Sequence, residues 1–240
     1  MSQRIQHEIA HGKKISSNAE SVWGWATPTG RVRSKRRAKY FIDLGKITPA
    51  SHVLEIGCGT GIFTKLIYES TNASIVAIDI SDDLLDQAVK KLPNVEFKIE
   101  DAMHTGFANE SFDCVFGSSV LHHLDLNRAS KEIFRVTKKG GSIVFAEPNM
   151  LNPQILIQKN IPFIKKWVGD SPDERAIVRW EFKSLLKKIG FRNVQIFPYD
   201  FLHPFTPSFM IPVVNGIGKM VEKIPLLKEI AGSVIIYAQK

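Results

Sequence analysis

The sequence contains few cysteines: Cys58 and Cys114 are the only two in 240 residues, and they form no CxxC pair. This scarcity excludes a disulfide scaffold and makes a reducing cytoplasm the expected compartment. The sequence also lacks any run of about eighteen apolar residues, so it predicts no transmembrane helix. Residues 1–30 are polar and contain no apolar h-region, so no signal peptide is expected.

Acidic residues are outnumbered, with 24 Asp and Glu against 32 Lys and Arg and a formal net charge of +8. The surface should therefore favour anions, which leaves nucleic acid, an acidic membrane face, an acidic substrate and mere solubility open. The remaining composition is that of an ordinary globular enzyme, which excludes collagen-like and disordered chains. A chain of 240 residues suits one α/β domain with additions.

Short apolar runs alternate with helical patterns between residues 52 and 147. The runs are rich in Val, Ile and Phe, as in strands that are covered on both faces. Strands are expected at 52–57, 74–79, 95–100, 112–117 and 141–147. Helices are expected near 61–70, 82–91 and 127–137, the last closed by Lys138, Lys139 and Gly140. This alternation predicts a parallel sheet with right-handed crossovers.

The C-terminal part departs from this alternation. A helix is expected at 179–189, ended by Gly190, and NVQIFPY and SVIIYA are two further strand candidates. Between these strands an apolar stripe recurs at helical spacing, formed by Phe209, Val213, Ile217, Met220 and Ile224 and interrupted by Pro212 and Gly216. We expect this stripe to pack into a core. The chain is predicted to be one domain over 1–240, with an N-terminal lid or extension at 1–45 and insertions at 148–178 and 201–230 that shape the acceptor site.

The stretch VLEIGCGTG, residues 53–61, places three glycines directly after the first apolar run. Such a turn lets the backbone approach a ligand at the switch point of a parallel sheet. The spacing fits neither GxGxxG nor a Walker A loop, and Glu55 would repel a pyrophosphate. S-adenosylmethionine has no phosphate, and its sulfonium and ammonium groups would attract this carboxylate. The motif therefore predicts that cofactor, whose own carboxylate the loop amides and the following helix N-terminus could serve.

Two acidic residues stand where an adenosyl group needs them. Asp79 ends the second predicted strand and can accept both ribose hydroxyls, and Ile80 beside it can lie flat on the adenine. Asp101 ends the third strand and, with Ala102 and Met103, can read the adenine edge. Either acid alone could be a helix or turn cap. Acids at two successive strand ends, downstream of ExGxGxG, favour the nucleoside interpretation.

The segments VLEIGCGTG, IVAIDIS, FDCVFGSSVLHHL and KKGGSIVFAEPN resemble the successive motifs of class I S-adenosylmethionine-dependent methyltransferases. They are most similar to the branch that acts on small molecules and lipids, the type 11-like methyltransferases. The resemblance covers about residues 50–150 and, more loosely, 175–240. It implies a Rossmann-like α/β fold with a seven-stranded, mostly parallel sheet in the order 3-2-1-4-5-7-6, strand 7 (SVIIYA) antiparallel, and helices on both faces.

The same resemblance implies a set of cofactor-binding residues. The family's positions correspond to Glu55, Gly57, Gly59, Asp79 and Asp101. The predicted cofactor site is completed by their neighbours Cys58, Gly61, Ile80, Ala102 and Met103 and by Ser118 after the fourth strand.

Methyl transfer is an in-line displacement, and much of its acceleration can come from positioning and from excluding water. A general base is needed only when the acceptor must lose a proton. His122 in SSVLHHLD is the candidate base, because an imidazole titrates near neutral pH; packing of this loop is the alternative, and it suits His123 better. Glu147 could orient the acceptor, act as a base or anchor the following loop. His122, His123 and Asp125 are too close in sequence to converge on one ion, so no metal is predicted.

The segment WGWATPTGRVRSKRRAKYF, residues 23–41, combines two tryptophans with six basic residues. It is expected to form a lid over the acceptor. Arg33, Arg37 and Tyr40 share a helical face and should point inward, the other basic residues should be solvated, and a wholly solvated basic face is the alternative. Acceptor-binding residues are therefore predicted at Trp25, Arg33, Arg37, Tyr40 and His123.

The sequence thus predicts methyl transfer to oxygen or carbon of a small, lipidic or acidic acceptor. RNA methylation and non-catalytic binding of S-adenosylmethionine are the alternatives, and the absence of an NPP(Y/F) tetrapeptide after strand four argues against DNA. The apolar stripe, with Phe201, Phe205 and Pro207, leaves a greasy acceptor pocket or a peripheral membrane contact open. A monomer and a homodimer are both compatible with the sequence.

Overall fold

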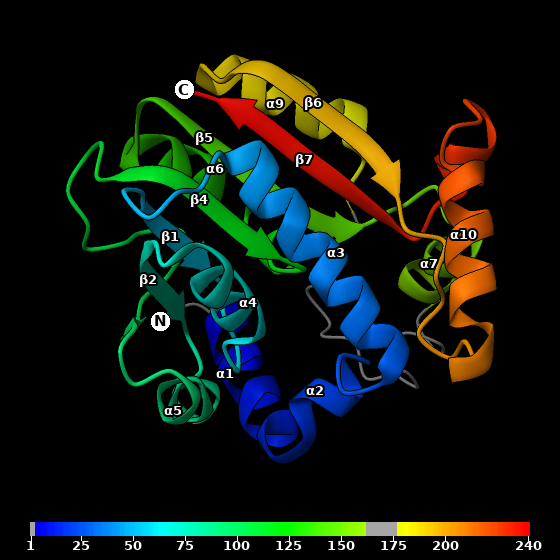
Figure 1. The fold of residues 1–240 in the computed structure, drawn as a ribbon. Helices are drawn as coiled ribbons and strands as arrows, with labels where there is room; N and C mark the ends of the chain where they lie inside the picture. Colours follow the sequence, from blue (N-terminus) through cyan, green and yellow to red (C-terminus); the bar gives the residue numbers. More distant parts are fainter. Residues whose placement is uncertain (1–2, 162–176) are drawn as a thin grey trace.

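The protein contains a seven-stranded sheet in the order β3-β2-β1-β4-β5-β7-β6, seen in a computed structural model that describes residues 3–161 and 177–240 (Figure 1). The strands are β1 His52–Ile56, β2 Ser74–Asp79, β3 Glu96–Ile99, β4 Phe112–Ser118, β5 Thr137–Pro148, β6 Arg192–Tyr199 and β7 Ser233–Gln239. Strand β7 runs antiparallel to both β5 and β6, and the other pairs are parallel. The predicted fold class and strand order are confirmed.

Helices cover both faces of this sheet. Those that follow its strands are α4 Ile62–Thr71, α5 Asp82–Lys91, α6 Leu126–Val136 and α9 Arg179–Ile189, and α3 Pro28–Gly45 precedes β1. Helices α3 and α4 pack on one face, where Phe41 and Ile67 are fully buried, and α6 and α9 pack on the other through Ile133 and Leu186. The helices predicted near 61–70, 82–91 and 179–189 are confirmed within a residue or two.

Strand β1 shows how the alternation of side chains divides the core. Leu54 and Ile56 belong to the cluster under α6 and α9, whereas Val53 faces the cluster under α3 and α4. Glu55 shares the parity of Val53, and successive side chains of a strand point to opposite faces. Its carboxylate is therefore directed to the α4 side of the sheet, where Thr64 lies.

The helix predicted near 127–137 is confirmed within a residue, but the strand after it begins four residues earlier than predicted. Helix α6 ends at Val136, and the chain turns extended at Thr137, so that Lys138–Gly140 belong to β5. Thr137 pairs with Phe112 of β4, and the Gly140 amide donates to the Lys240 carbonyl at 2.9 Å. Pairing with β4 and with the end of β7 thus places Lys138–Gly140 in the strand, so these residues do not cap the helix.

The remaining elements lie around the carboxyl edge of the sheet. They are α1 Gln3–Ile15, η1 Ser16–Asn18, α2 Ala19–Val22, η2 Leu121–His123, α7 Pro153–Asn160, η3 Ser208–Met210, α10 Ile211–Val221 and η4 Leu227–Ile230. Pro212 stands in the first turn of α10 and Gly216 lies within it, so neither interrupts this helix. The predicted insertion at 148–178 contains α7, and its residues 162–176 lie outside the described residues. None of the helices within 3–161 and 177–240 is long and apolar enough to cross a membrane.

Candidate active site

A pocket of about 800 Å³ opens where the carboxyl ends of β1, β2 and β4 meet. Ligand pockets for small molecules typically measure about 300–1,000 Å³, so this one can hold a nucleoside and a second small molecule. Its walls contain the loop after β1, the ends of β2 and β4, and α1 with the Val22–Trp25 stretch. Aliphatic and aromatic side chains line much of it: Ile5, Ile15, Val22, Trp23, Trp25, Ile62, Phe63, Leu84 and Phe205.

The glycine loop is held by its own backbone. Gly57 and Gly59 adopt left-handed φ angles of 67° and 52°, and a side chain on Gly57 would come within 2.3 Å of Val120. The amides of Gly57 and Cys58 both donate to the Ile78 carbonyl, at 2.8 and 3.0 Å. The Gly59 amide donates to Asp79 at 2.8 Å. These three amides therefore stabilise the loop, and the expectation that the loop amides serve a ligand carboxylate does not hold for them.

Glu55 lies beneath the loop rather than in the pocket wall. Its side chain is 1% exposed, and it accepts a hydrogen bond from the Thr64 hydroxyl of α4. Burial raises the pKa of Glu55 to about 8, although the Thr64 hydrogen bond lowers it. At neutral pH the carboxyl is thus mostly protonated in this structure.

Asp79 and Asp101 both line the pocket, as predicted from their positions at the ends of two strands. Asp79 also accepts hydrogen bonds from the Gly59 amide and, at 3.0 Å, from the Ser81 amide. Burial raises the pKa of Asp79 against these backbone hydrogen bonds. Asp101 accepts from the Met103 amide at 2.9 Å. Each carboxylate therefore holds a turn and faces the pocket, so the cap and ligand interpretations do not exclude one another.

His122 and Glu147 form a buried pair after β4 and at the end of β5. The His122 Nδ1 lies 2.7 Å from the Glu147 Oε2, and the side chains are 6% and 0% exposed. The other Glu147 oxygen accepts from the Val120 and Leu121 amides, both at 2.9 Å. Burial raises the pKa of Glu147, but the His122 ring and these amides outweigh it and hold the pKa below its ordinary value. His122 lines the pocket and Glu147 does not, so Glu147 positions the ring and the loop.

His123 joins this group from the pocket side. Its ring stacks at a tilt on that of His122, with 4.2 Å between centroids. Its Nδ1 lies 3.0 Å from a carboxylate oxygen of Glu8 on α1. Two imidazoles, each with a carboxylate at Nδ1, therefore stand together in one wall. Among the described residues no cluster of three or more His, Cys, Asp or Glu side chains could hold a metal ion.

The pocket is covered by α1, which lies within the predicted lid or extension at 1–45 although no motif pointed to this helix. Ile5, Glu8, Gly12 and Ile15 recur at helical spacing and line it. A side chain on Gly12 would come within 2.5 Å of Ser81, so α1 approaches the end of β2 closely. The helical spacing of these four residues was the one available signal.

The stretch after α2 closes the pocket from the side of the glycine loop. Trp23 lies over Gly59, where an added Cβ would come within 2.9 Å of its ring, and Trp25 lines the pocket as predicted. Glu20 accepts from the Thr60 hydroxyl at 3.0 Å and pairs with Lys91. These contacts tie the N-terminal extension to the loop that follows β1.

Comparison with known proteins agrees with this geometry. The methyltransferase domain family matches residues 54–145. The chain is 32% identical over 193 residues to a demethylmenaquinone methyltransferase of Chlorobaculum parvum, over 71% of this chain and 77% of that protein. The chain belongs to the class I S-adenosylmethionine-dependent methyltransferases. The predicted resemblance, the enzyme class and the cofactor are thereby confirmed.

Two further comparisons extend this result. The methyltransferase is 27% identical over 183 residues to a 2-methyl-6-phytyl-1,4-hydroquinone methyltransferase of Synechocystis sp., over 72% of this chain and 57% of that protein. A SAM-dependent methyltransferase from Archaeoglobus fulgidus has the same fold, with a TM-score of 0.63, 23% identity and coverage of 88% of this chain and 94% of that one.

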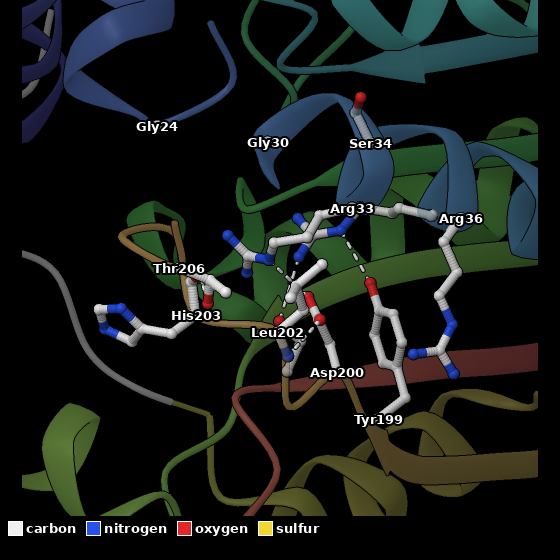
Figure 2. Close-up of polar contacts among 12 residues, drawn as sticks. Gly24, Gly30, Arg33, Ser34, Arg36, Tyr199, Asp200, Leu202, His203 and Thr206 are labelled. Carbon is white, nitrogen blue, oxygen red and sulfur yellow. Dashed lines mark hydrogen bonds and ion pairs between the residues drawn. The ribbon is translucent and has the colours of Figure 1, made fainter. Parts of the chain in front are cut away.

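The basic helix α3 of the methyltransferase lies behind the pocket wall. Arg37 is 2% exposed and donates to the Tyr199 and Ser233 hydroxyls at 2.8 and 3.1 Å and to Ser118 and Ser119 at 2.7 and 3.2 Å. Arg33 points inward to Asp200 at the end of β6, at 2.8 Å (Figure 2). Neither arginine lines the pocket: all three guanidinium nitrogens of Arg37 donate within the protein, and Arg33 is directed to Asp200.

Arg36 departs from the expectation that the other basic residues are solvated. It forms an ion pair with Glu222, and its guanidinium lies 5.4 Å from the Tyr199 ring centroid, a neighbour visible in Figure 2. Lys35 and Lys39 of the same helix are exposed, as expected. The prediction failed for Arg36 because its partner is 186 residues away along the chain.

Most of the predicted cofactor positions of the methyltransferase meet at the pocket. Nine of the eleven line it: Gly57, Cys58, Gly59, Asp79, Ile80, Asp101, Ala102, Met103 and Ser118. Glu55 lies beneath, and Gly61 instead caps α4 with a φ of 77°. Of the predicted acceptor residues, Trp25 and His123 line the pocket, whereas Arg33, Arg37 and Tyr40 do not.

Proposed function

We propose that this methyltransferase transfers a methyl group to oxygen or carbon of a small lipidic acceptor, with His122 as the general base. The observation that supports this most is the ring of His122 in the pocket wall, with its Nδ1 2.7 Å from a fully buried glutamate. A carboxylate at Nδ1 fixes the tautomer and leaves Nε2 as the basic nitrogen. Glu147 accepts from His122 and two amides and therefore positions the base without touching the acceptor.

The residues around the glycine loop fit S-adenosylmethionine. Asp79 is placed to accept hydrogen bonds from the ribose hydroxyls, and Asp101 with Ala102 and Met103 borders the position proposed for the adenine. The loop Gly57–Gly61 contains no Lys or Arg, which suits a ligand without phosphate. When bound there, the cofactor would supply its methyl group as an electrophile, and the carbon–sulfur bond would break to leave S-adenosylhomocysteine.

The chain's own residues would then act on the acceptor. His122 takes the proton of an acceptor hydroxyl, or of an activated carbon, as that atom forms its bond to the methyl carbon. The imidazolium that results is stabilised by Glu147, whose lowered pKa keeps it ionised. Trp23, Trp25 and α1 cover the pocket and exclude water, which favours transfer to the acceptor over hydrolysis.

The acceptor class is supported by the pocket walls. Aliphatic and aromatic side chains in these walls suit an apolar molecule. Both relatives described above act, by their names, on a quinone or hydroquinone. Arg4 adds one cationic group: its Nε and Nη2 are buried in the wall and make no hydrogen bond within the part of the chain that the structure describes. We therefore propose that Arg4 meets an anion, which is either the cofactor's carboxylate or an acidic group of the acceptor.

The proposal is tested by methyl transfer from labelled S-adenosylmethionine to a panel of prenylated hydroquinones, aromatic carboxylates and RNA. Label in a hydroquinone or a carboxylate, lost in His122→Gln while S-adenosylhomocysteine still binds, is the expected result. Loss of about 10²–10⁴-fold is typical for a general base. Label in RNA alone, or an unimpaired His122→Gln, contradicts the proposal.

The anion that Arg4 meets is identified by the variant Arg4→Gln. A raised Kd for S-adenosylmethionine with an unchanged acceptor KM assigns Arg4 to the cofactor. The opposite pattern assigns Arg4 to an acidic acceptor.

A further inference from the structure

Helix α10 has apolar side chains on two opposite faces. Ile211 and Gly218 are buried against the protein, and an added Cβ on Gly218 would lie 3.1 Å from Phe201. Val213, Ile217 and Met220 point the other way and are 60%, 56% and 69% exposed. An amphipathic helix normally turns its apolar side to the protein core and its polar side to solvent. The outward side of α10 therefore lacks an apolar partner among the described residues, and the expected core packing of this stripe is wrong.

The outward side continues beyond both ends of the helix. We call it the α10 face, formed by Phe209, Met210, Val213, Ile217, Met220, Ile224, Leu226, Leu227 and Ile230. These nine residues make up half of the eighteen exposed large hydrophobic side chains in the described part of the protein. A concentration of this kind is typical of an interaction surface. Figure 1 shows α10 at the rim of the molecule, outside β6 and β7.

Within the segment 201–230, the exposed charged side chains are all basic. Glu222 and Glu229 are the only acidic residues between 201 and 230, and both turn inward, to Arg36 and Arg179. Lys219 and Lys223 are exposed beside the apolar side chains. An apolar helix face flanked by lysines is the pattern of an interfacial helix, which buries its apolar side at the level of the headgroups and attracts anionic lipids.

The α10 face adjoins the mouth of the pocket. Phe205 lines the pocket and is 85% exposed, so it belongs to the opening. Helix α7 is bound to η4 by Asn152, whose amide donates to the Ile230 carbonyl at 2.7 Å. On α7 itself Gln154 and Gln158 line the pocket, whereas Leu156 is exposed. The elements that form the pocket mouth thus also present apolar side chains outward.

We propose that the α10 face docks this methyltransferase onto a bilayer that contains anionic lipid, so that an acceptor dissolved in the bilayer reaches the pocket past Phe205. The passage of the acceptor rests on the proposed function, whereas the docking does not. A second copy of the chain fits the face less well, because a two-fold contact would bring Lys219 and Lys223 of both copies together with no free carboxylate of the face between them.

The test is flotation of the full chain with vesicles of phosphatidylcholine alone and of phosphatidylcholine mixed with phosphatidylglycerol. The wild type should float with the mixed vesicles and much less with the neutral ones. Ile217→Glu/Met220→Glu should weaken this binding by about tenfold or more, since two large side chains no longer insert. Val89→Glu, at an exposed valine on α5, is the matched control and should float like the wild type.

The lysines give a second measurement. Lys219→Gln/Lys223→Gln should weaken binding to the anionic vesicles and flatten its dependence on salt. The proposal is overturned by a wild type that floats with neither vesicle. It is equally overturned by Ile217→Glu/Met220→Glu binding like the wild type, or by a wild-type dimer that this double variant dissociates.

Turnover of a detergent-dispersed hydroquinone without vesicles separates the two proposals. Turnover without flotation rejects only the docking. Flotation by the wild type that the double variant loses establishes the docking even when no acceptor is turned over.

Discussion

The two sides of the pocket are held together in different ways. On the side of the glycine loop, backbone amides of Gly57, Cys58 and Gly59 donate to Ile78 and Asp79, the residues that end the neighbouring strand. On the side of the N-terminal extension and the C-terminal insertion, charged side chains form ion pairs between residues far apart in the sequence. Arg33, for example, donates to Asp200, which is 167 residues away. Local turn chemistry leaves a motif in the sequence, whereas a distant side-chain pair does not. Variants on each side should therefore fail in different ways.

Among the variants that test this comparison, the largest effect is expected from Asp79→Ala, on the side of the glycine loop. This change removes the proposed acceptor of the ribose hydroxyls, and each hydrogen bond to a charged group contributes about 1.5–3 kcal/mol. The Kd for S-adenosylhomocysteine should rise by about 10–150-fold, measured by calorimetry. Asp43→Ala, at an exposed position of α3, is the control. An unchanged Kd would mean that Asp79 only holds the glycine loop.

The second effect concerns the long-range ion pair between α3 and α10. Arg36→Ala leaves the largely buried Glu222 without its partner, which should cost about 2 kcal/mol of unfolding free energy. Lys39→Ala removes an exposed pair with Asp43 on the same helix and should cost well under 1 kcal/mol. Denaturant titration measures both variants. Equal losses would show that this side is not held by its distant pairs.

The third effect tests the turn that carries the two tryptophans. A side chain on Gly30 would come within 2.0 Å of the Gly24 carbonyl oxygen and 2.7 Å of the Trp25 Cα, so backbone must move. Gly30→Ala should cost about 1–2 kcal/mol and raise the acceptor KM by displacing Trp25. Gly216→Ala meets open space within α10 and should stabilise by about 0.5–1 kcal/mol. Thermal melts measure the stability of both variants, and steady-state kinetics measure the acceptor KM. A Gly30→Ala variant as stable as Gly216→Ala would contradict the predicted clash.

The fourth effect concerns the dependence of the unfolding free energy on pH. Because the folded pKa of Glu55 is about 8, the folded state holds a proton that the unfolded state loses at the ordinary glutamate pKa near 4.5. Stability should therefore fall as pH rises between these two values, by about 1.4 kcal/mol for each pH unit. Glu55→Gln mimics the protonated carboxyl and should flatten this slope. Denaturant titrations at pH 6 and pH 7 compare the two proteins, and parallel slopes would reject the raised pKa.

The sequence patterns predicted the strands and the glycine-loop side of the pocket because both have local causes. Alternating apolar runs predicted six of the seven strands within a residue or two, whereas β5 begins four residues before its predicted start. The ExGxGxG motif and two strand-end acids predicted eleven cofactor residues, and nine of them line the pocket. Glu55 was predicted to bind the cofactor, but the direction of its side chain depends on which face of β1 packs against α4. The helix stop assigned to Lys138–Gly140 was wrong, since Thr137 pairs with β4 and these three residues continue strand β5.

The sequence by itself determined the fold, the cofactor and the enzyme family, because a glycine turn and strand-end carboxylates are short-range features that need no distant partner. Only the tertiary structure decided that α1 covers the pocket, that Arg36 meets Glu222 and that Glu147 holds His122 from beneath. It also decided that the apolar stripe of α10 faces outward, because the inward face of the helix is already filled against Phe201. A periodic pattern reveals that a helix has an apolar side, but what covers that side depends on packing between residues far apart in the chain.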